Sequence, residues 1–565
     1  MNKIYFLILT YFLSCTFSAS AQTNVTDVKT ANQYVANKDW DKAIVAFTDL
    51  IAKDKYNGQF YMSLAESYYN KKEYKKSIEN YIKGIDVGYA SNSAAYNIAC
   101  CYSLMGDADN AISWIKTAAK YKYSNLEDAI RKDSDFDNIR NNEKFKDFIY
   151  PGNLPESKRT ERWKADITYL KERMEETHYR IFDVVTKSQW DNKYSELLTK
   201  IDDMDDEHVM TEIAKIVASV GDGHTIMFPA DKSISKFQSY PVKFYKFKDG
   251  LYIKGISSEY SQYTGMKATK IGTMTTEDAL KKIAEVVPHD NEFGIDWQCI
   301  NYLTYNYCLY GLGISDSKDV LKLELQDDNG KKVNAAIKKT ETDFFKSFHS
   351  GSNDGFVYAN EKSANPLPLY LKNASDRYWF ELLPDINFVY MQVNAIQNKK
   401  EEKLKDFYDR VFRFIDSNNV KGIIIDLRLN SGGDNNNNKY LINNFIRNPK
   451  INQRGKVFTI IGRNTFSAAM NLTSDLENNT QTIFIGEPTG SKPNFIGEIN
   501  FIELPYSGIK VSASSRNWQK SVSEDRRKWV YPEIYTPLNF SDYKNNIDPA
   551  MNAVYDYINY LKKSQ

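Results

Sequence analysis

Residues 422–471 constrain the fold of this 565-residue chain more than any other stretch. They hold two short apolar runs rich in β-branched residues, 421–427 and 457–461, and each run predicts a strand buried on both faces. The glycine pair Gly432-Gly433 follows the first run, and Ser467 follows the second and precedes good helix formers. Buried strands that alternate with helices predict a mostly parallel sheet covered by helices.

Ser467 stands at the predicted corner between a strand and a helix, where the first backbone N–H groups of the helix have no intrahelical partner. The turn of Gly432 and Gly433 on the neighbouring strand can bring another N–H group beside it. A nucleophile next to an oxyanion hole is the geometry that acyl transfer needs. We therefore interpret Ser467 as a nucleophile and the N–H groups of Gly432 or Gly433 and of Ala468 as oxyanion donors. The alternative is a serine that only caps a helix.

The same residues resemble the tail-specific (C-terminal processing) serine protease family, which includes the tricorn core peptidases. Three segments carry the resemblance, namely Asp-Leu-Arg-Leu-Asn-Ser-Gly-Gly (426–433), Phe-Ser-Ala-Ala (466–469) and Gly-Glu-Pro-Thr-Gly (486–490). It extends over roughly residues 159–560. It implies a serine-type peptidase that hydrolyses peptide or protein substrates through an acyl-enzyme, without a metal or another cofactor. It also implies a multidomain chain whose α/β protease core, of the ClpP/crotonase-like type, occupies residues 380–565.

A single histidine lies at the tip of a glycine turn, in Gly-Asp-Gly-His (221–224). The chain has five histidines, and the other four lack such a turn. The Ser/Lys members of the family resemble this turn but lack the histidine, whereas the tricorn-like members carry a histidine there as general base. The resemblance therefore implies that His224 is the base for Ser467, although the two residues lie far apart in the sequence.

In tricorn-like members a glutamate downstream of the nucleophile assists the base. Counted from Ser467, that offset falls on Glu524, with Asp525 as an alternative. A merely solvated charged run over residues 524–528 is the structural alternative. A different mechanism uses Lys492 as the base, at the offset found in Ser/Lys members. A lysine acts in this way only where burial lowers its pKa towards neutrality.

Residues 24–150 contain an internal repeat, and its period matches the length of about 34 residues that is typical of tetratricopeptide units. The period appears at Ala31, Ala65 and Ala99, at Tyr34, Tyr68 and Tyr102, and at Ile44, Ile78 and Ile112. Each such unit is a helix-turn-helix, so we expect an all-α region. A stack of these units presents a concave surface to a peptide or a partner protein, and the alternative is a spacing module without a ligand.

Two regions separate the repeats from the core. Residues 159–232 have helical apolar spacing and end in the histidine turn, as in the helical subdomain that precedes the protease core in the family. Residues 238–345 are predicted to be mostly β and are similar to a PDZ-like domain, which would capture a substrate chain end as an added strand. A β-domain without a ligand is the alternative. Within it, residues 290–312 depart from a minimal PDZ domain and predict a lid or an insertion.

Residues 1–21 are predicted to be a secretory signal peptide, with Lys3 before an apolar run and Ala19-Ser20-Ala21 at the cleavage site. The apolar run is too short to span a bilayer, and no later stretch is long and apolar enough. We therefore expect an exported protein, periplasmic or secreted. Lipoprotein anchoring through Cys15 is the alternative.

The net charge of +1 gives no basic or acidic field that would point to nucleic acid or to a membrane surface. The remaining cysteines, Cys100, Cys101, Cys299 and Cys308, lack metal-ligand spacing. We expect buried thiols, and a disulfide between Cys299 and Cys308 is the alternative.

Overall fold

The computed structural model describes residues 27–121, 123, 126–149, 158–228, 238–341 and 355–563. The chain forms two compact units. Unit 1 runs to Tyr123 and includes Ser134–Asn142, and unit 2 comprises Ser124–Asp133 and Glu143–Gln565. The predicted signal peptide, residues 1–21, lies outside the described residues.

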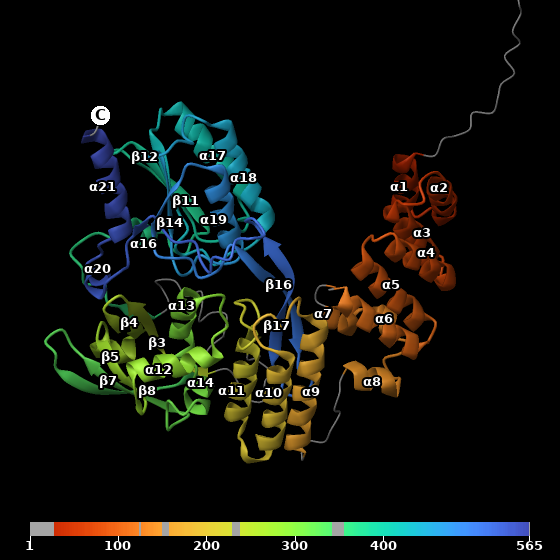
Figure 1. Cartoon of the computed structure of the whole chain (residues 1–565), viewed down its shortest axis with the longest axis horizontal. Coiled ribbons are helices and arrows are strands. Elements are labelled where there is room, and N and C mark those ends of the chain that lie inside the picture. The colour runs from red at the N-terminus through yellow and green to blue at the C-terminus, as the bar shows by residue number, and fades with distance from the viewer. Residues whose placement is uncertain are drawn as a thin grey trace, which may run out of the picture. The chain divides into compact units, whose positions relative to one another are not determined.

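Unit 1 is a series of α-helices, each of which packs against the next (Figure 1). They are α1 (Val28–Ala36), α2 (Trp40–Lys53), α3 (Gly58–Asn70), α4 (Tyr74–Asp86), α5 (Ser91–Leu104) and α6 (Ala108–Lys120). Helices α2, α4 and α6 begin at equal intervals along the chain, with the period that the sequence repeat has. Ala31, Ala65 and Ala99 are fully buried, and their small side chains let neighbouring helices approach closely.

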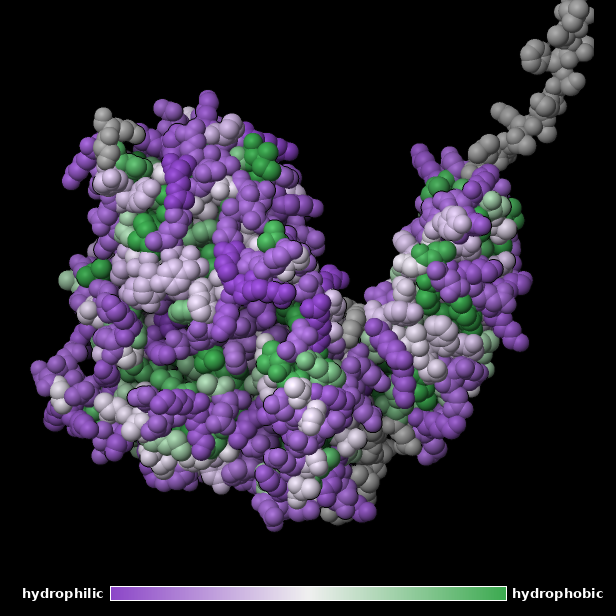
Figure 2. Space-filling model, viewed as in Figure 1, coloured by the Kyte–Doolittle hydropathy of each residue, from purple (hydrophilic) through white to green (hydrophobic). Residues whose placement is uncertain are grey.

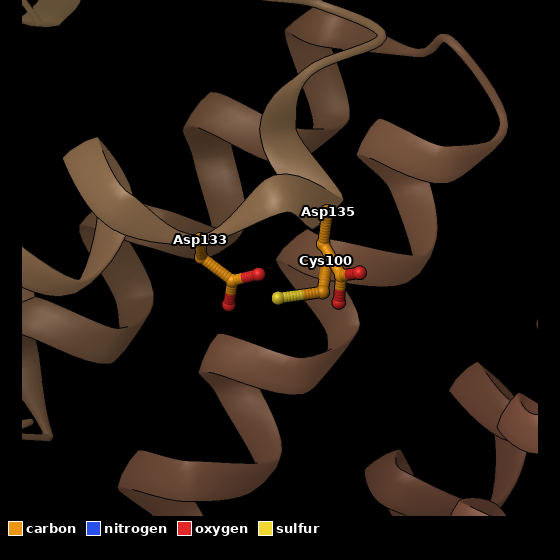
Figure 3. Close-up of side chains that lie close together, drawn as sticks. All are labelled: Cys100, Asp133 and Asp135. Atoms are coloured by element: carbon orange, nitrogen blue, oxygen red, sulfur yellow. The ribbon is translucent and has the colours of Figure 1, made fainter.

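A 3₁₀ helix, η1 (Ser134–Phe136), follows and packs on α5 within unit 1. Asp135 accepts a hydrogen bond from the Tyr69 hydroxyl, and its backbone carbonyl accepts one from the Ser103 hydroxyl at 2.7 Å. The Asp135 carboxylate and the Cys100 sulfur lie within 4.8 Å of each other. Figure 3 shows the two side chains. These contacts fix η1 against the body of unit 1.

Unit 2 begins with two short helices and a helical layer. The helices are α7 (Leu126–Lys132), α8 (Glu143–Ile149), α9 (Arg159–Thr177), α10 (Lys187–Lys200) and α11 (Asp206–Ala218). The buried side chains of α9–α11 share one apolar core with a β-rich domain that follows in the chain. The histidine turn comes directly after α11.

The β-rich domain is built on an antiparallel sheet of seven strands in the order β10-β4-β5-β7-β8, with β3 beside β4 and β6 beside β5. The strands are β3 (Val242–Phe247), β4 (Gly250–Ser257), β5 (Lys267–Ile271), β6 (Met274–Thr275), β7 (Val320–Gln326), β8 (Lys332–Lys338) and β10 (Phe356–Tyr358). The domain also holds α12 (Thr276–Ile283), α13 (Glu292–Tyr302), α14 (Asn306–Gly311) and the strand pair β2 (Gln238–Ser239) and β9 (Thr340–Glu341). Residues 290–312 contain α13 and α14, and their Cys299, Tyr302 and Leu309 are buried in the domain core.

The core contains a sheet of six strands in sequence order, parallel except for the first. The strands are β11 (Tyr378–Leu383), β12 (Phe388–Val393), β13 (Gly422–Asp426), β14 (Val457–Ile461), β15 (Ile483–Gly486) and β18 (Ile534–Tyr535). Ile423 and Ile425 pack under α17 (Leu404–Ser417), α18 (Asn438–Arg447) and α19 (Ala468–Asn479), whereas Ile424 packs under α21 (Pro549–Lys563) on the opposite face. Figure 1 shows these two helical layers on either side of the sheet. The predicted mostly parallel sheet is confirmed.

A long hairpin leaves the core and reaches the helical layer. It consists of β16 (Asn494–Glu503) and β17 (Lys510–Gln519), and β17 pairs with β1 (Met227–Phe228), which follows the histidine turn. The far end of the hairpin, including Leu504 and Val511, is buried in the apolar core shared with α9–α11.

An aromatic cluster joins the β-rich domain to the core. Phe247 of β3 packs with Phe540 and Tyr543 of α20 (Phe540–Lys544), and the ring of Tyr252 stacks on Phe540 at a centroid distance of 4.1 Å. Figure 2 shows hydrophobic atoms along the line where these two parts of unit 2 meet. The two parts therefore share a packed interface, which brings residues of the β-rich domain close to the strand ends of the core.

Cys100, Cys101, Cys299 and Cys308 are buried, and no disulfide joins any of these four described cysteines, so the alternative of a Cys299–Cys308 disulfide is wrong. Within the described ranges, no helix combines the length and the apolar character needed to cross a bilayer.

Candidate active site

Ser467 stands directly before α19, at the strand-to-helix corner that the sequence predicted. Its backbone has φ 53° and ψ −124°, in a region that residues other than glycine rarely adopt. Strain of this kind gathers at functional sites, and a serine nucleophile on a sharp strand-to-helix turn is one known use of it. The Ser467 side chain makes no capping hydrogen bond, so the alternative of a serine that only caps α19 has no support.

Gly432 and Gly433 lie close to Ser467 and tolerate no side chain. At Gly432 φ is 120°, and a Cβ there would lie 2.7 Å from the Ser467 Cβ and 3.0 Å from the Ala468 nitrogen. At Gly433 φ is 138°, and a Cβ would lie 2.3 Å from the Ile396 carbonyl oxygen. Only glycine allows the turn to pass this close to the serine.

The backbone N–H groups of Gly432, Gly433 and Ala468 differ in whether they are free to bind a substrate oxyanion. The Gly432 N–H donates to Asn430 Oδ1 at 2.9 Å, so it is already occupied. The N–H groups of Gly433 and Ala468 have no acceptor among the residues that the structure describes. These two groups are therefore the ones that a substrate oxyanion can bind, and Gly432 shapes the turn between them.

Asn430 is a site residue that the sequence analysis missed. It is fully buried, its Nδ2 donates to the Val393 carbonyl at 2.8 Å, and its backbone carbonyl accepts from the Phe466 N–H at 3.2 Å. Together with the bond to Gly432, these contacts tie the glycine turn to β12 and to the segment before the serine. An asparagine in a turn gives no sequence signal that distinguishes this role from ordinary turn formation.

The imidazole of His224 stacks on two phenylalanines. Its ring centroid lies 4.4 Å from that of Phe466 and 5.3 Å from that of Phe495. Since Phe466 immediately precedes Ser467, the stack places His224 beside the segment of the nucleophile. Both ring nitrogens are buried and lack a hydrogen-bond partner in the described part of the chain, and the nearby backbone of Ile496 lies outside hydrogen-bond geometry.

Asp222 organises the turn that carries His224. Its Oδ1 accepts from the N–H groups of His224 and Thr225, both at 2.9 Å, and from the Ser514 hydroxyl at 2.7 Å. Its Oδ2 accepts from His178 Nε2 at 2.8 Å. Burial alone would raise the pKa of Asp222, but the hydrogen bonds from His178, Ser514 and Thr225 outweigh burial and lower it to about 2. Asp222 is therefore an ionised anchor of the turn.

Burial also governs the charge of His224. It lowers the pKa of the imidazole below its ordinary value, while the negative charges of Asp290, Asp222 and Glu498 act in the opposite direction. The net lowering leaves the ring neutral at neutral pH. A neutral imidazole with an unoccupied nitrogen is the form that accepts a proton from a serine.

Glu524 and Asp525 lie in the segment after β17. Glu524 is exposed, and Asp525 pairs with Arg527 at 2.7 Å. Neither carboxylate is among the charges that act on His224. A third catalytic member at Glu524 thus stays a prediction from the resemblance, without a contact to the histidine in the described part of the chain.

Lys492 follows β15 and is half-buried. Its charge acts on Asp290, and in the described ranges no hydrogen bond or ion pair joins Lys492 to Ser467. Within these ranges, no direct contact therefore supports the alternative Ser/Lys arrangement.

Arg463 anchors the nucleophile segment to the β-rich domain. It lies between β14 and Ser467. Its Nη1 donates to the Lys246 carbonyl at 3.0 Å, and its Nη2 donates to the Tyr245 hydroxyl at 2.9 Å. Its Nε donates to Glu487 at 3.3 Å. A fixed planar guanidinium with three partners holds this segment in one position.

A comparison with models of protein families matches one segment of the core. Residues 387–454 match the model of peptidase family S41. The matched segment includes β12, α17, β13 and the glycine turn, and it ends before β14 and Ser467. No curated protein sequence matches the chain.

Several solved structures are similar to this chain. Mature CPAF complexed with lactacystin has 12% sequence identity and a TM-score of 0.50, over 72% of this chain and 98% of that chain. Mature CPAF in a second crystal structure has 12% identity and a TM-score of 0.49, over 72% and 97%. The photosystem II D1 C-terminal processing protease has 10% identity and a TM-score of 0.33, over 68% and 94%. The first of these likenesses shows a shared fold.

Proposed function

We propose that this chain, whose core matches the model of peptidase family S41 over residues 387–454, is a serine-type peptidase that forms an acyl-enzyme on Ser467. The observation that carries the proposal is the backbone of Ser467, which has φ 53° on a strand-to-helix corner. Acyl transfer also requires an oxyanion hole and a base. The glycine turn beside Ser467 supplies the first, and His224, stacked on Phe466, supplies the second.

In the proposed reaction, His224 takes the proton of Ser467 while the serine Oγ attacks the carbonyl carbon of the scissile peptide bond. The N–H groups of Gly433 and Ala468 bind the oxyanion of the tetrahedral intermediate. The protonated His224 then donates its proton to the leaving amine. Water repeats the sequence on the acyl-enzyme and releases the second product.

Two alternatives lead to different outcomes. In the first, Lys492 replaces His224 as the base. Its support is the loop position that the Ser/Lys members of the family use. In the second, the chain binds peptides or other ligands without turnover, and the strained backbone of Ser467 has no catalytic role.

A fluorophosphonate probe distinguishes these three cases. We expect labelling at Ser467 in the wild-type protein, none in Ser467→Ala, and almost none in His224→Ala. Ser417→Ala, at the exposed end of α17, is the matched control and should label normally. Labelling that survives in His224→Ala but is lost in Lys492→Ala would favour the lysine base. An unlabelled wild-type protein that keeps its fold would favour the binding protein.

We further propose how substrates reach the site. Peptides or proteins are the substrates that a peptidase family implies. By the repeat of about 34 residues, the helical unit 1 recruits a protein substrate or a partner protein. By the resemblance to a PDZ-like domain, the β-rich domain captures a chain end by strand addition. By the signal-peptide pattern, the mature protein lies outside the cytoplasm after removal of residues 1–21. N-terminal sequencing of the mature protein tests the last point, since the proposal requires Gln22 as the first residue.

A further inference from the structure

We propose that Asp290, which the β-rich domain contributes, completes the active site as the carboxylate that positions His224 and stabilises its protonated form during catalysis. This inference rests on the proposed function, because it concerns the same histidine. The residue directly precedes Asn291, the N-cap of α13.

The two oxygens of Asp290 bridge the two loops of the site. Oδ1 accepts from the Gly223 N–H at 3.1 Å, and Gly223 is the residue immediately before His224. Oδ2 accepts from the Ser491 hydroxyl, in the loop that leads from β15 to β16. One carboxylate therefore holds the histidine turn against a loop of the core. Burial raises the pKa of Asp290 above its ordinary value, whereas the charge of Lys492 and the Ser491 hydrogen bond favour the ionised form.

The neighbouring residue clamps Asp290 in place. Asn291 Nδ2 donates to the backbone carbonyls of Thr489 at 3.1 Å and Lys528 at 2.6 Å, and its Oδ1 accepts from the Gly294 N–H at 2.8 Å. The start of α13 lies so close to the core that a Cβ at Gly294 would lie 2.7 Å from the Gly490 carbonyl oxygen. Asp290 thus has a fixed position relative to the histidine turn.

The charged groups around His224 differ in what they can contribute. Asp222, on the same turn, is occupied by four hydrogen bonds. Glu498, from β16, is exposed, so solvent screens its charge. Of the three, Asp290 does most to raise the pKa of the imidazole, and the charge of Lys492 acts in turn on Asp290. Of the three carboxylates, Asp290 is the one placed to stabilise a positive charge on the ring.

That stabilisation matters at one step. His224 is neutral in the resting enzyme and becomes positively charged as it takes the proton of Ser467. A fixed negative charge beside the ring lowers the free energy of the charged form, and therefore of the transition state that leads to it. Asp290 does not touch the substrate in this scheme, so it is a positioning residue.

Asp290→Asn tests the charge with little change in shape, because the amide oxygen still accepts from Gly223. We expect kcat/KM at its plateau to fall by roughly tenfold or more. We also expect the acidic limb of the pH profile to move to lower pH, since loss of the negative charge lowers the pKa of His224 further. A limb that does not move, with kcat/KM within twofold of wild type, would overturn the proposal.

Two further variants separate charge from simple scaffolding. Ser491→Ala removes one hydrogen bond to Asp290 and keeps its charge, so the acidic limb should stay in place. Glu524→Gln removes the carboxylate that the resemblance favours and should leave that limb unchanged. If Ser491→Ala and Asp290→Asn lose activity equally and the acidic limb of the pH profile stays in place in both, the role of Asp290 is structural and the proposal is wrong.

Different results would refute the proposed function and the proposed role of Asp290. If Ser467→Ala keeps its activity, the nucleophile is elsewhere and both proposals fall. If Ser467→Ala and His224→Ala are inactive but Asp290→Asn behaves as wild type, only the role of Asp290 is wrong. If Asp290→Asn does not fold, Lys492→Gln tests the same charge effect in the opposite direction. Loss of the positive charge of Lys492 should move the acidic limb of the pH profile to higher pH. A limb that stays in place or moves to lower pH would then overturn the proposal.

Discussion

The rings of His224 and Phe466 stack with their centroids 4.4 Å apart. One belongs to the turn after α11, and the other directly precedes the nucleophile candidate on the core. A single aromatic contact thus joins the base and the serine, which are far apart in the sequence.

Phe466→Leu should therefore lower kcat/KM by about tenfold, because the apolar volume is largely kept while the stack that orients the imidazole is lost. Phe412→Leu is the matched control. Phe412 lies on α17 and packs against Phe445 of α18, so its loss should lower the melting temperature without changing the activity of the folded protein. Equal activity of Phe466→Leu and wild type in a peptide cleavage assay would show that the stack does not orient the base.

The pH profile should reflect a buried histidine. Burial lowers the pKa of His224, so the neutral, active form persists to lower pH than for a free imidazole. The midpoint of the acidic limb of kcat/KM should fall below about pH 6.5. A limb centred at pH 8 or above would instead indicate a lysine base.

Substitution of the two candidate bases should agree with that profile. His224→Ala should cost nearly as much as Ser467→Ala, on the order of 10³-fold, because the members of a catalytic unit are not additive. Lys492→Ala should retain most of the activity. An inactive Lys492→Ala beside an active His224→Ala would place the enzyme with the Ser/Lys members.

Gly432→Ala should inactivate the enzyme. The new Cβ would lie 2.7 Å from the Ser467 Cβ, and a backbone with φ 120° adds strain of about 1–3 kcal/mol. Gly313→Ala is the matched control, because φ is 65° there and no atom lies within 4 Å of the new methyl group. The control should lose stability but keep fluorophosphonate labelling, whereas a normally labelled Gly432→Ala would mean that the glycine turn does not border the nucleophile.

Removal of residues 1–123 should leave a peptidase that cleaves small peptides, because unit 2 forms its own compact core. By the recruiting role proposed for unit 1, this variant should cleave protein substrates more slowly. Removal of residues 1–150 should in addition lower the melting temperature, since it deletes α7. That helix packs on β16, where Arg131 donates to the Glu503 carbonyl at 3.3 Å. Unchanged cleavage of proteins by the shorter deletion would contradict the recruiting role.

The sequence predicted the strand-to-helix corner at Ser467 well because buried parallel strands leave a strong local signal. The runs 421–427 and 457–461 became β13 and β14, and Ser467 directly precedes α19. Continuous apolar runs occur where both faces of a strand are covered, so their position alone indicates the strand ends that carry a site.

The hairpin of β16 and β17 was harder to predict because its polar residues serve other contacts. The Ser512 hydroxyl donates to the His224 carbonyl at 2.6 Å, and the Ser514 hydroxyl donates to Asp222. Buried serines interrupt the apolar alternation by which a strand is recognised.

Asp290 could not be predicted from the sequence. Its partner Gly223 lies 67 residues earlier, and its partner Ser491 lies 201 residues later. Contacts over such distances leave no periodic pattern, and only the folded arrangement of the two domains brings these residues together.

The pairing of β1 with β17 also sets when the histidine turn can acquire its partners during synthesis. Thr225 and Ser514 are hydrogen-bonded but lie 289 residues apart. At about 5–20 residues per second, a ribosome needs roughly 15 to 60 s to add that length. Throughout this interval the emerging histidine turn lacks the partners that β17 supplies. The base that we propose at His224 therefore lacks the support of β17 until translation is nearly complete.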